Sequence, residues 1–73
     1  QQRRQKRLEK AVAEAEAQVT QLESAVSILE ARMATQEGSA DTSIYDRHAR
    51  LKKQLAQAEA EWEKAVDELE ECP

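Results

Sequence analysis

The spacing of the apolar residues restricts this chain to one kind of architecture. From Leu8 to Met33 they recur at alternating steps of four and three residues, and a second run with the same spacing extends from Ile44 to Leu69. Such spacing places one apolar stripe, a seam, along an α-helix, as in coiled coils. The seam positions are Leu8, Val12, Ala15, Val19, Leu22, Val26, Leu29 and Met33, followed by Ile44, His48, Leu51, Leu55, Ala58, Trp62, Ala65 and Leu69.

The two runs are separated by a polar segment that reads TQEGSADTS. Its Gly38 is the only glycine of the chain and suits the position just after the end of a helix. Asp41, Thr42 and Ser43 are all favourable residues for a helix start, and Ser43 with Asp46 resembles a capping box. The sequence therefore predicts a helix over about residues 2–36, a turn over about 37–43 and a helix over about 43–71.

Two seam-bearing helices joined by a short turn bury their seams only when they lie antiparallel. We therefore expect an all-α fold, a two-helix antiparallel coiled-coil hairpin, as a single domain over residues 1–73. A shift of the register by one heptad would set Trp62 against Leu22. The register that fills every layer, with large residues facing small ones, pairs Leu8 with Leu69, Val12 with Ala65, Ala15 with Trp62, Val19 with Ala58, Leu22 with Leu55, Val26 with Leu51, Leu29 with His48 and Met33 with Ile44.

The composition agrees with a hairpin and excludes a thick globular core. A chain of 73 residues suffices for one small domain, and its only aromatic residues are Trp62 and Tyr45. Charged residues make up 36% of the chain, which is typical of long helices and coiled coils. No apolar run reaches the ~18 residues that a membrane span needs, so we expect no membrane partner.

The cysteine content and the first ten residues bear on the cellular setting. Cys72 is the only cysteine, which favours a reducing, intracellular location over a disulfide-stabilised secreted domain. The chain starts without Met, and the segment QQRRQKRLEK holds five basic residues and one acidic residue. Because the N-terminus of a helix carries a positive partial charge, such a basic start favours a helix that continues upstream. We therefore expect the chain to be a piece of a larger protein.

Catalytic and cofactor-binding motifs are not visible in the sequence. It contains no GxxxxGK[ST], GxGxxG, HxxxH or CxxC pattern. His48, the only histidine, stands at a seam position, and we interpret it as a partly exposed packing residue. We expect no enzymatic activity, metal or cofactor in this chain.

Five glutamates recur every seven residues on the e edge of the first helix: Glu9, Glu16, Glu23, Glu30 and Glu37. We expect them to form a solvated edge, along which Lys52 of the second helix could reach Glu23 or Glu30.

Trp62 has two interpretations. As a seam residue it fills the space left by Ala15 and Ala58, and burying an indole contributes a few kcal/mol. It could alternatively be a stacking platform for a base or for a partner helix. The seam position favours the packing role.

The basic residues form two clusters. The turn cluster consists of Arg32, Arg47, Arg50, Lys52 and Lys53, and the open-end cluster consists of Arg3, Arg4, Lys6, Arg7 and Lys10. In the expected register Arg32 and Arg47 face each other on the g edge, which leaves either a solvated tip relieved by Asp41, Asp46 and Glu37 or a site for an anion such as a nucleic-acid phosphate. The open-end cluster would lie beside Glu68, Glu70 and Glu71, so interhelical neutralisation competes there with phosphate contact.

The segments RRQKRLEK, SADTSIYD and LKKQLAQAEAEWEKAVDELEE, with Tyr45 after the turn and Trp62-Glu63 on the return helix, give the chain a family resemblance. Over about residues 3–71 it resembles the C-terminal coiled-coil domain of ABC-F proteins, which are soluble tandem ATP-binding-cassette ATPases. The resemblance implies a cytoplasmic bacterial parent protein with two upstream cassettes that bind ATP. It also implies an association with DNA binding, in a family whose wider membership acts on ribosomes.

Two functions follow as hypotheses. The first is a non-catalytic accessory domain that contacts nucleic acid, either DNA or ribosomal RNA, through the turn cluster and secondarily through Arg3, Arg4, Lys6 and Arg7. Such contacts would be directed to the backbone, because the chain lacks the aromatic residues of a base-stacking surface. The alternative is a structural spacer or protein-docking coiled coil, which could contact the ATPase domains of the parent or form a homo-oligomer such as a four-helix bundle.

Overall fold

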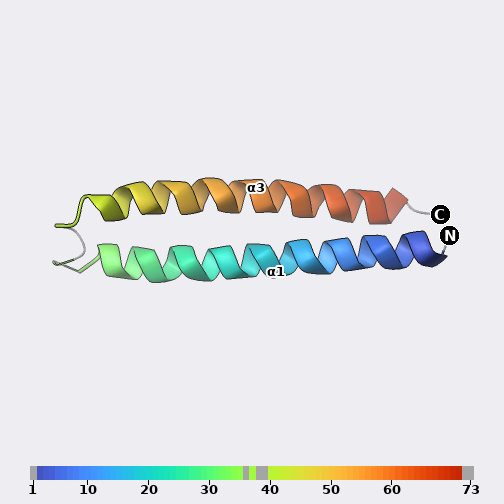
Figure 1. The fold of residues 1–73 in the computed structure, drawn as a ribbon, viewed down its shortest axis with the longest axis horizontal. Coiled ribbons are helices and arrows are strands. Elements are labelled where there is room, and N and C mark those ends of the chain that lie inside the picture. The colour runs from blue at the N-terminus through green and yellow to red at the C-terminus, as the bar shows by residue number, and fades with distance from the viewer. Residues whose placement is uncertain (1, 36, 38–39, 72–73) are drawn as a thin grey trace.

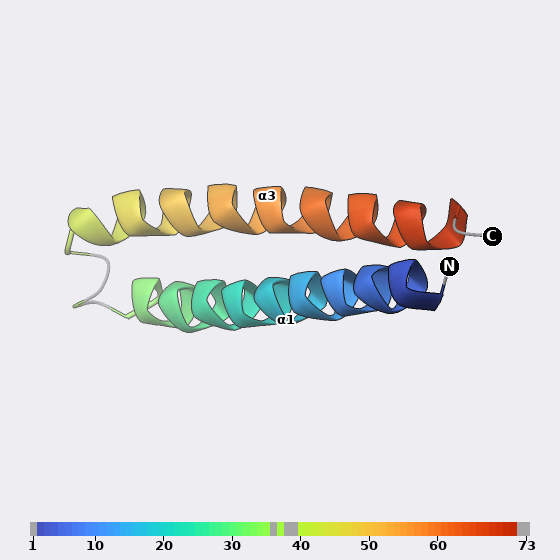
Figure 2. The ribbon, with the colours of Figure 1, turned by 45° about the vertical axis from the view of Figure 1, so that its right-hand side comes forward.

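The protein is a rod of two antiparallel helices. The structure, a computed structural model, describes residues 2–35, 37 and 40–71. Helix α1 (Gln2–Met33) and helix α3 (Ser43–Glu71) lie side by side over their whole length (Figures 1 and 2). The Cα atoms extend over 55 × 14 × 13 Å. The expected all-α hairpin is therefore confirmed, and neither helix is apolar enough over a sufficient length to cross a bilayer.

The burial of side chains follows the heptad spacing. All 16 seam residues of the sequence are buried or half-buried. Among the other described side chains, only Ala25 and Val66 are half-buried, and the rest are exposed. The 4–3 spacing thus identified the whole interface, because in a two-helix rod there is no third layer to bury any other face.

The core is tightest in the half of the rod that is next to the turn. The most buried side chains are Val26, Leu29, Ile44 and Ala58, with 5%, 7%, 4% and 5% of their surface exposed. Three of these four belong to the layers nearest the turn, where large residues face one another. Toward the open end the seam contains the small residues Ala15 and Ala65, which do not fill the space between the helices. The other seam residues at that end are therefore only half-buried.

Helix α1 ends at Met33, three residues earlier than the sequence predicts. The amide and the hydroxyl of Thr35 both donate to the carbonyl oxygen of Arg32, at 3.1 and 2.7 Å, which favours a tight last turn over a continued helix. Between the two helices the structure describes residues 34–35, 37 and 40–42. The expected role of Gly38 lies outside the described residues.

Helix α3 is capped by Asp41 and not by the expected capping box. Atom Oδ1 of Asp41 accepts a hydrogen bond from the amide of Ser43 at 3.0 Å and another from its hydroxyl at 2.7 Å. The amide of Ile44 donates to the Asp41 carbonyl at 3.2 Å, as at a helix N-cap. Of the three N-cap residues that the sequence offers, Asp41 is therefore the one used, and the amide of Ser43, from which the Asp46 carboxylate would accept in a capping box, donates to Asp41 instead.

The register agrees with the layer pairing expected from the sequence. Atom Nε2 of His48 lies 3.9 Å from Oε2 of Glu30, which places His48 beside the layer of Leu29. Halfway along the rod, Leu22 and Ala58 line the same groove. A shift by one heptad would move His48 about two turns away from Glu30, so the structure has the unshifted register.

The two sides of the rod differ in character. We call the side formed by heptad positions g and c of both helices the groove face, and the side formed by positions e and b the glutamate face. The glutamate face carries Glu9, Glu16, Glu23 and Glu30 of α1 opposite Val66, Glu59, Lys52 and Tyr45 of α3. The groove face carries Ala11, Gln18, Ala25 and Arg32 of α1 opposite Glu68, Glu61, Gln54 and Arg47 of α3.

Candidate functional site

The turn end of the groove face brings two arginines together. Arg32 lies in the last turn of α1, and Arg47 lies five residues into α3. In the observed register they are opposed across the edge of the seam, and both side chains are exposed. Among the described residues neither takes part in an ion pair. Two arginines thus stand on facing helices at this end of the rod, and both side chains are exposed to a ligand.

Asp41 is the carboxylate that both arginines influence. Its pKa is lowered, mainly by the hydrogen bonds from the hydroxyl and the amide of Ser43 and further by the charges of Arg47 and Arg32. A shallow hollow of about 290 Å³ beside it is lined by Arg32, Thr35, Glu37, Asp41 and Ile44. Glu37 is a second exposed carboxylate beside this hollow, so Asp41 and Glu37 together offset the charges of Arg32 and Arg47, and the excess positive charge on the groove face near the turn comes from Arg50.

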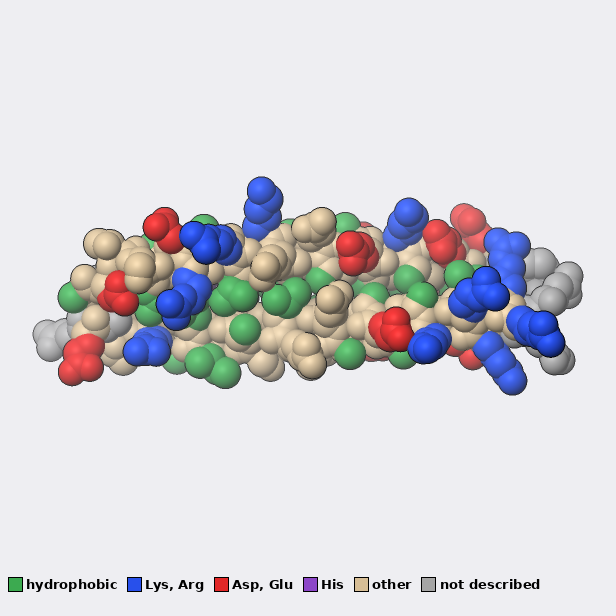
Figure 3. Space-filling view, in the orientation of Figure 1, with side chains coloured by type: hydrophobic (Ala, Val, Ile, Leu, Met, Phe, Trp, Pro, Cys, Tyr) green, Lys and Arg blue, Asp and Glu red, His purple; other side chains and the backbone are tan. Residues whose placement is uncertain are grey.

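The structure divides the turn cluster into two sets. Arg50 lies one helical turn after Arg47 and shares the groove face with it and with Arg32. Lys52 belongs to the glutamate face, and Lys53 lies on the outer side of α3. All five side chains are exposed, and none forms an ion pair in the part of the chain that the structure describes. Lysine and arginine side chains accordingly gather over both helices near the turn in Figure 3.

The open-end cluster is not neutralised as expected. Its side chains are exposed, and the only ion pair of the cluster among the described residues is within α1, between Lys10 Nζ and Glu14 Oε1 at 3.9 Å. The register explains the missing interhelical pairs, since Glu68 faces Ala11 and Glu9 faces Val66. Among the described residues, acidic side chains of α3 therefore form no direct ion pair with this cluster.

Among the described residues, the glutamate face has one close contact between polar side chains of the two helices. Glu30 contacts His48 and not Lys52, and within the described residues Lys52 pairs with neither Glu30 nor Glu23. Nε2 of His48 is itself buried without a hydrogen-bond partner among those residues. The remaining glutamates of this face are exposed and stand along a convex surface, as the sequence indicates.

Trp62 is a seam residue in the structure. Its side chain is half-buried, and its Nε1 is buried without a hydrogen-bond partner among the described residues. The ring thus takes part in the seam, where the register sets it opposite Ala15. The packing interpretation of Trp62 therefore fits the geometry.

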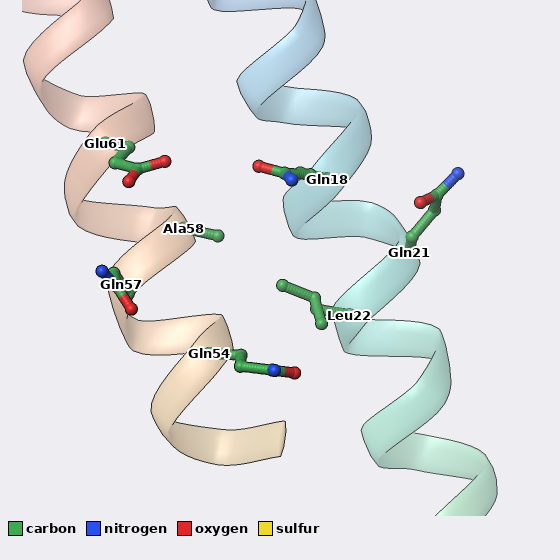
Figure 4. Close-up of a pocket in the computed structure, with 7 residues that line it drawn as sticks. All are labelled: Gln18, Gln21, Leu22, Gln54, Gln57, Ala58 and Glu61. Atoms are coloured by element: carbon green, nitrogen blue, oxygen red, sulfur yellow. The ribbon is translucent and has the colours of Figure 1, made fainter. Parts of the chain in front are cut away.

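The seam pattern does not predict a groove that runs along the middle of the groove face. We call it the glutamine groove after the four glutamines that line it. Figure 4 shows four glutamines lining it, two from each helix, with Leu22, Ala58 and Glu61 among them. The groove has a volume of about 480 Å³, and a second hollow of about 440 Å³ follows it toward the open end, where Ala11, Ala15 and Ala65 are small. The signal was present in the sequence as Gln18, Gln21, Gln54 and Gln57 at positions c and g beside alanine-containing layers.

Ile28 is a further residue that the seam pattern does not explain. It stands at position c of α1, and 71% of its surface is exposed. Tyr45, at 47%, is the other large hydrophobic residue exposed within the described part of the chain, and it lies on the glutamate face. The groove face thus carries one large apolar side chain close to a groove.

Groups that could hold a metal ion are absent from the described residues: no three His, Cys, Asp or Glu side chains converge there. Comparison of the chain with protein-family models, with curated proteins and with solved structures gives no match. The resemblance to the ABC-F coiled-coil domain therefore rests on the sequence segments that carry it.

Proposed function

We propose that the hairpin is a non-catalytic module that contacts the phosphate backbone of nucleic acid through the turn end of its groove face. Arg32, Arg47 and Arg50 make the primary contacts in this proposal, and Lys52 and Lys53 flank them. The observation that carries it is the opposition of two exposed arginines on facing helices, with a third, Arg50, on the same face and with Asp41 and Glu37 as the carboxylates beside them.

The physical argument concerns like charges in a rigid frame. Two guanidinium groups held on facing helices repel each other, and an exposed carboxylate that is already engaged by Ser43 offsets this only in part. A phosphate group placed between them accepts charge-assisted hydrogen bonds from both and removes the repulsion. The fixed spacing of the helices means that the protein loses little conformational freedom when it binds.

The expected mode of binding is insensitive to sequence. The one indole is in the seam, and Tyr45 lies on the other face, so the arginines have no aromatic platform beside them. Guanidinium–phosphate contacts fix position and orientation without reading bases. DNA and ribosomal RNA are both suitable partners for such a surface.

The resemblance to ABC-F proteins supports the same proposal. It would make the hairpin an accessory domain of a cytoplasmic ATPase whose cassettes bind ATP. The hairpin would then deliver its basic tip to nucleic acid while the parent supplies the chemistry. The open-end residues Arg3, Arg4, Lys6 and Arg7 would provide a second, weaker set of phosphate contacts close to those cassettes.

Fluorescence anisotropy with labelled duplex DNA and with RNA, at several salt concentrations, tests the proposal. Three phosphate contacts predict a slope of log K against log[salt] of about −3. Arg47→Glu with Arg50→Glu should abolish binding. The matched control is Lys52→Glu with Lys53→Glu, which changes the net charge equally on other sides of α3 and should weaken binding much less.

Two results would contradict the proposal. Absence of binding at low salt would leave the spacer or protein-docking function as the better account. Equal losses in the two double variants would show that only net charge matters and that the opposed arginines form no site.

A further inference from the structure

The groove face carries a protruding side chain, Ile28, and a recess, the glutamine groove at Leu22, which are too far apart to contact each other within one molecule. Ile28 is 71% exposed, and Leu22 lines the glutamine groove on the same helix. The two residues are six positions apart, which is about 9 Å along the helix axis. They can meet only between two molecules.

A twofold axis brings them together. In an interface with twofold symmetry, if residue i of one copy contacts residue j of the other, then j also contacts i. Ile28 and Leu22 are each three residues from Ala25, on opposite sides of it. An axis through the layer of Ala25 and Gln54, perpendicular to the rod, therefore lays Ile28 of each copy over Leu22 of the other.

The same axis produces complementary charges. Arg47 and Glu61 are each seven residues from Gln54, so Arg47 of one copy lies over Glu61 of the other. Arg32 and Gln18 are each seven residues from Ala25, and Gln18 shares its layer with Glu61. Both opposed arginines of one copy would thus face the carboxylate of the second copy, and this occurs twice in the dimer.

The length of the face suits a weak but specific dimer. An axis at this layer overlaps about three quarters of the 55 Å rod, and with a width of 14 Å each partner buries roughly 600 Å². The total of about 1,200 Å² lies at the lower end of specific protein interfaces. The other charged residues of the groove face in or beside the overlap are all exposed to water; they are Glu14, Glu37, Asp41, Arg50, Lys64 and Glu68.

We propose that two copies of this chain associate through their groove faces as an antiparallel, twofold-symmetric four-helix assembly. Ile28 of each copy fills the groove over Leu22 of the other, and Arg47 pairs with Glu61. The inference is independent of nucleic-acid binding, but the two uses compete for Arg32 and Arg47. The free hairpin would shield its basic tip until nucleic acid displaces the second copy.

Sedimentation equilibrium of the 73-residue chain without nucleic acid, from about 5 to 500 µM at low salt, tests the assembly. We expect a dimer with a dissociation constant on the order of tens of µM. Glu61→Lys and Arg47→Glu should each weaken it about tenfold or more, because each replaces two attractive pairs by repulsive ones. The double variant, and equimolar mixtures of the two single variants, should associate again.

Two further variants separate this geometry from non-specific association. Glu59→Lys makes the same charge change two residues away but on the glutamate face, and it should leave the dimer intact. Ile28→Ser removes the protruding side chain without touching the seam and should weaken the dimer about tenfold or more. Circular dichroism establishes that each variant keeps its helices.

The proposal fails if the chain stays monomeric at about 500 µM, if Glu59→Lys and Glu61→Lys have equal effects, or if the mixture of single variants does not associate. None of these results depends on nucleic acid. Loss of the dimer in Glu61→Lys with unchanged or stronger nucleic-acid binding would support both proposals, and failure of either leaves the other standing.

Discussion

Nε2 of His48 lies 3.9 Å from Oε2 of Glu30, and this contact joins the two helices in the second layer from the turn. The glutamate side chain is 56% exposed, whereas the imidazole is 24% exposed and its Nε2 is buried. A distance of 3.9 Å is too long for a hydrogen bond. The seam therefore contains a buried polar atom that gains little from its neighbour.

Replacement of His48 should stabilise the hairpin. His48→Leu removes the unpartnered nitrogen and places an apolar residue opposite Leu29, which should raise the free energy of unfolding by about 1–2 kcal/mol. Thermal unfolding followed by circular dichroism measures the change. Glu30→Gln is the control and should change stability by less than about 0.5 kcal/mol. A destabilised His48→Leu variant would mean that the contact with Glu30 stabilises the fold.

Stability should be unequal along the rod. Leu29 is 7% exposed near the turn, while Leu8 is half-buried at the open end. Leu29→Ala should cost about 3 kcal/mol and Leu8→Ala only about 1 kcal/mol, because less surface is buried at Leu8. Chemical denaturation of both variants tests this, and amide hydrogen exchange should be fastest at the open end. Equal losses would contradict a core concentrated at the turn.

Trp62 should matter for folding through its ring and not through its N–H. Trp62→Ala should cost about 2–4 kcal/mol by leaving a gap opposite Ala15. Trp62→Phe retains an aromatic ring and removes the unpartnered Nε1, so its cost should be below about 1.5 kcal/mol. Unfolding measured by circular dichroism distinguishes the two. A large loss of nucleic-acid binding in a folded Trp62→Phe variant would instead indicate a recognition role.

Asp41 should make the fold sensitive to acid. Because its pKa is lower in the folded state than the ordinary value of 3.8, the unfolded chain binds the proton more readily. The contribution is therefore fully present above pH 3.8 and is lost as the pH falls through the folded-state pKa. Asn at this position still caps a helix but does not titrate.

The midpoint of thermal unfolding between about pH 2 and pH 6 measures this effect. The advantage of the wild type over Asp41→Asn should grow as the pH rises through this range. Ser43→Ala removes the hydroxyl that contributes most to the lowered pKa, so it should reduce the pH dependence. An unchanged profile in both variants would show that the cap does not titrate with the fold.

Much of the fold could be predicted from the sequence because a two-helix rod has only one buried interface. Heptad spacing alone identifies that interface, and the alternation of large and small residues favours one register. The helix ends were less predictable. The helix ends depend on which local groups form hydrogen bonds. The hydroxyl of Thr35 donates to the carbonyl of Arg32 near the end of α1, and the amide and hydroxyl of Ser43 both donate to Asp41 at the start of α3.

The candidate site was predictable in part. The sequence indicated that Arg32 and Arg47 are opposed, but not that Arg50 joins them while Lys52 and Lys53 point elsewhere. The expected neutralisation at the open end failed because pairing depends on which residues share an edge and not on nearness along the rod. The glutamine groove does not follow from the residues at positions a and d alone. It lies beside them, in the hollows that small seam residues leave.

The hairpin also has a fixed reach. Helix α1 begins and helix α3 ends at the same end of the rod, so the turn stands about 55 Å away from both (Figure 1). Anything joined to that end is held at two points, which restrains the rod from swinging freely. The number of heptads then sets a distance: adding or removing one in each helix would move the charged tip by about 10 Å and rotate it little, so a binding partner would distinguish the lengths.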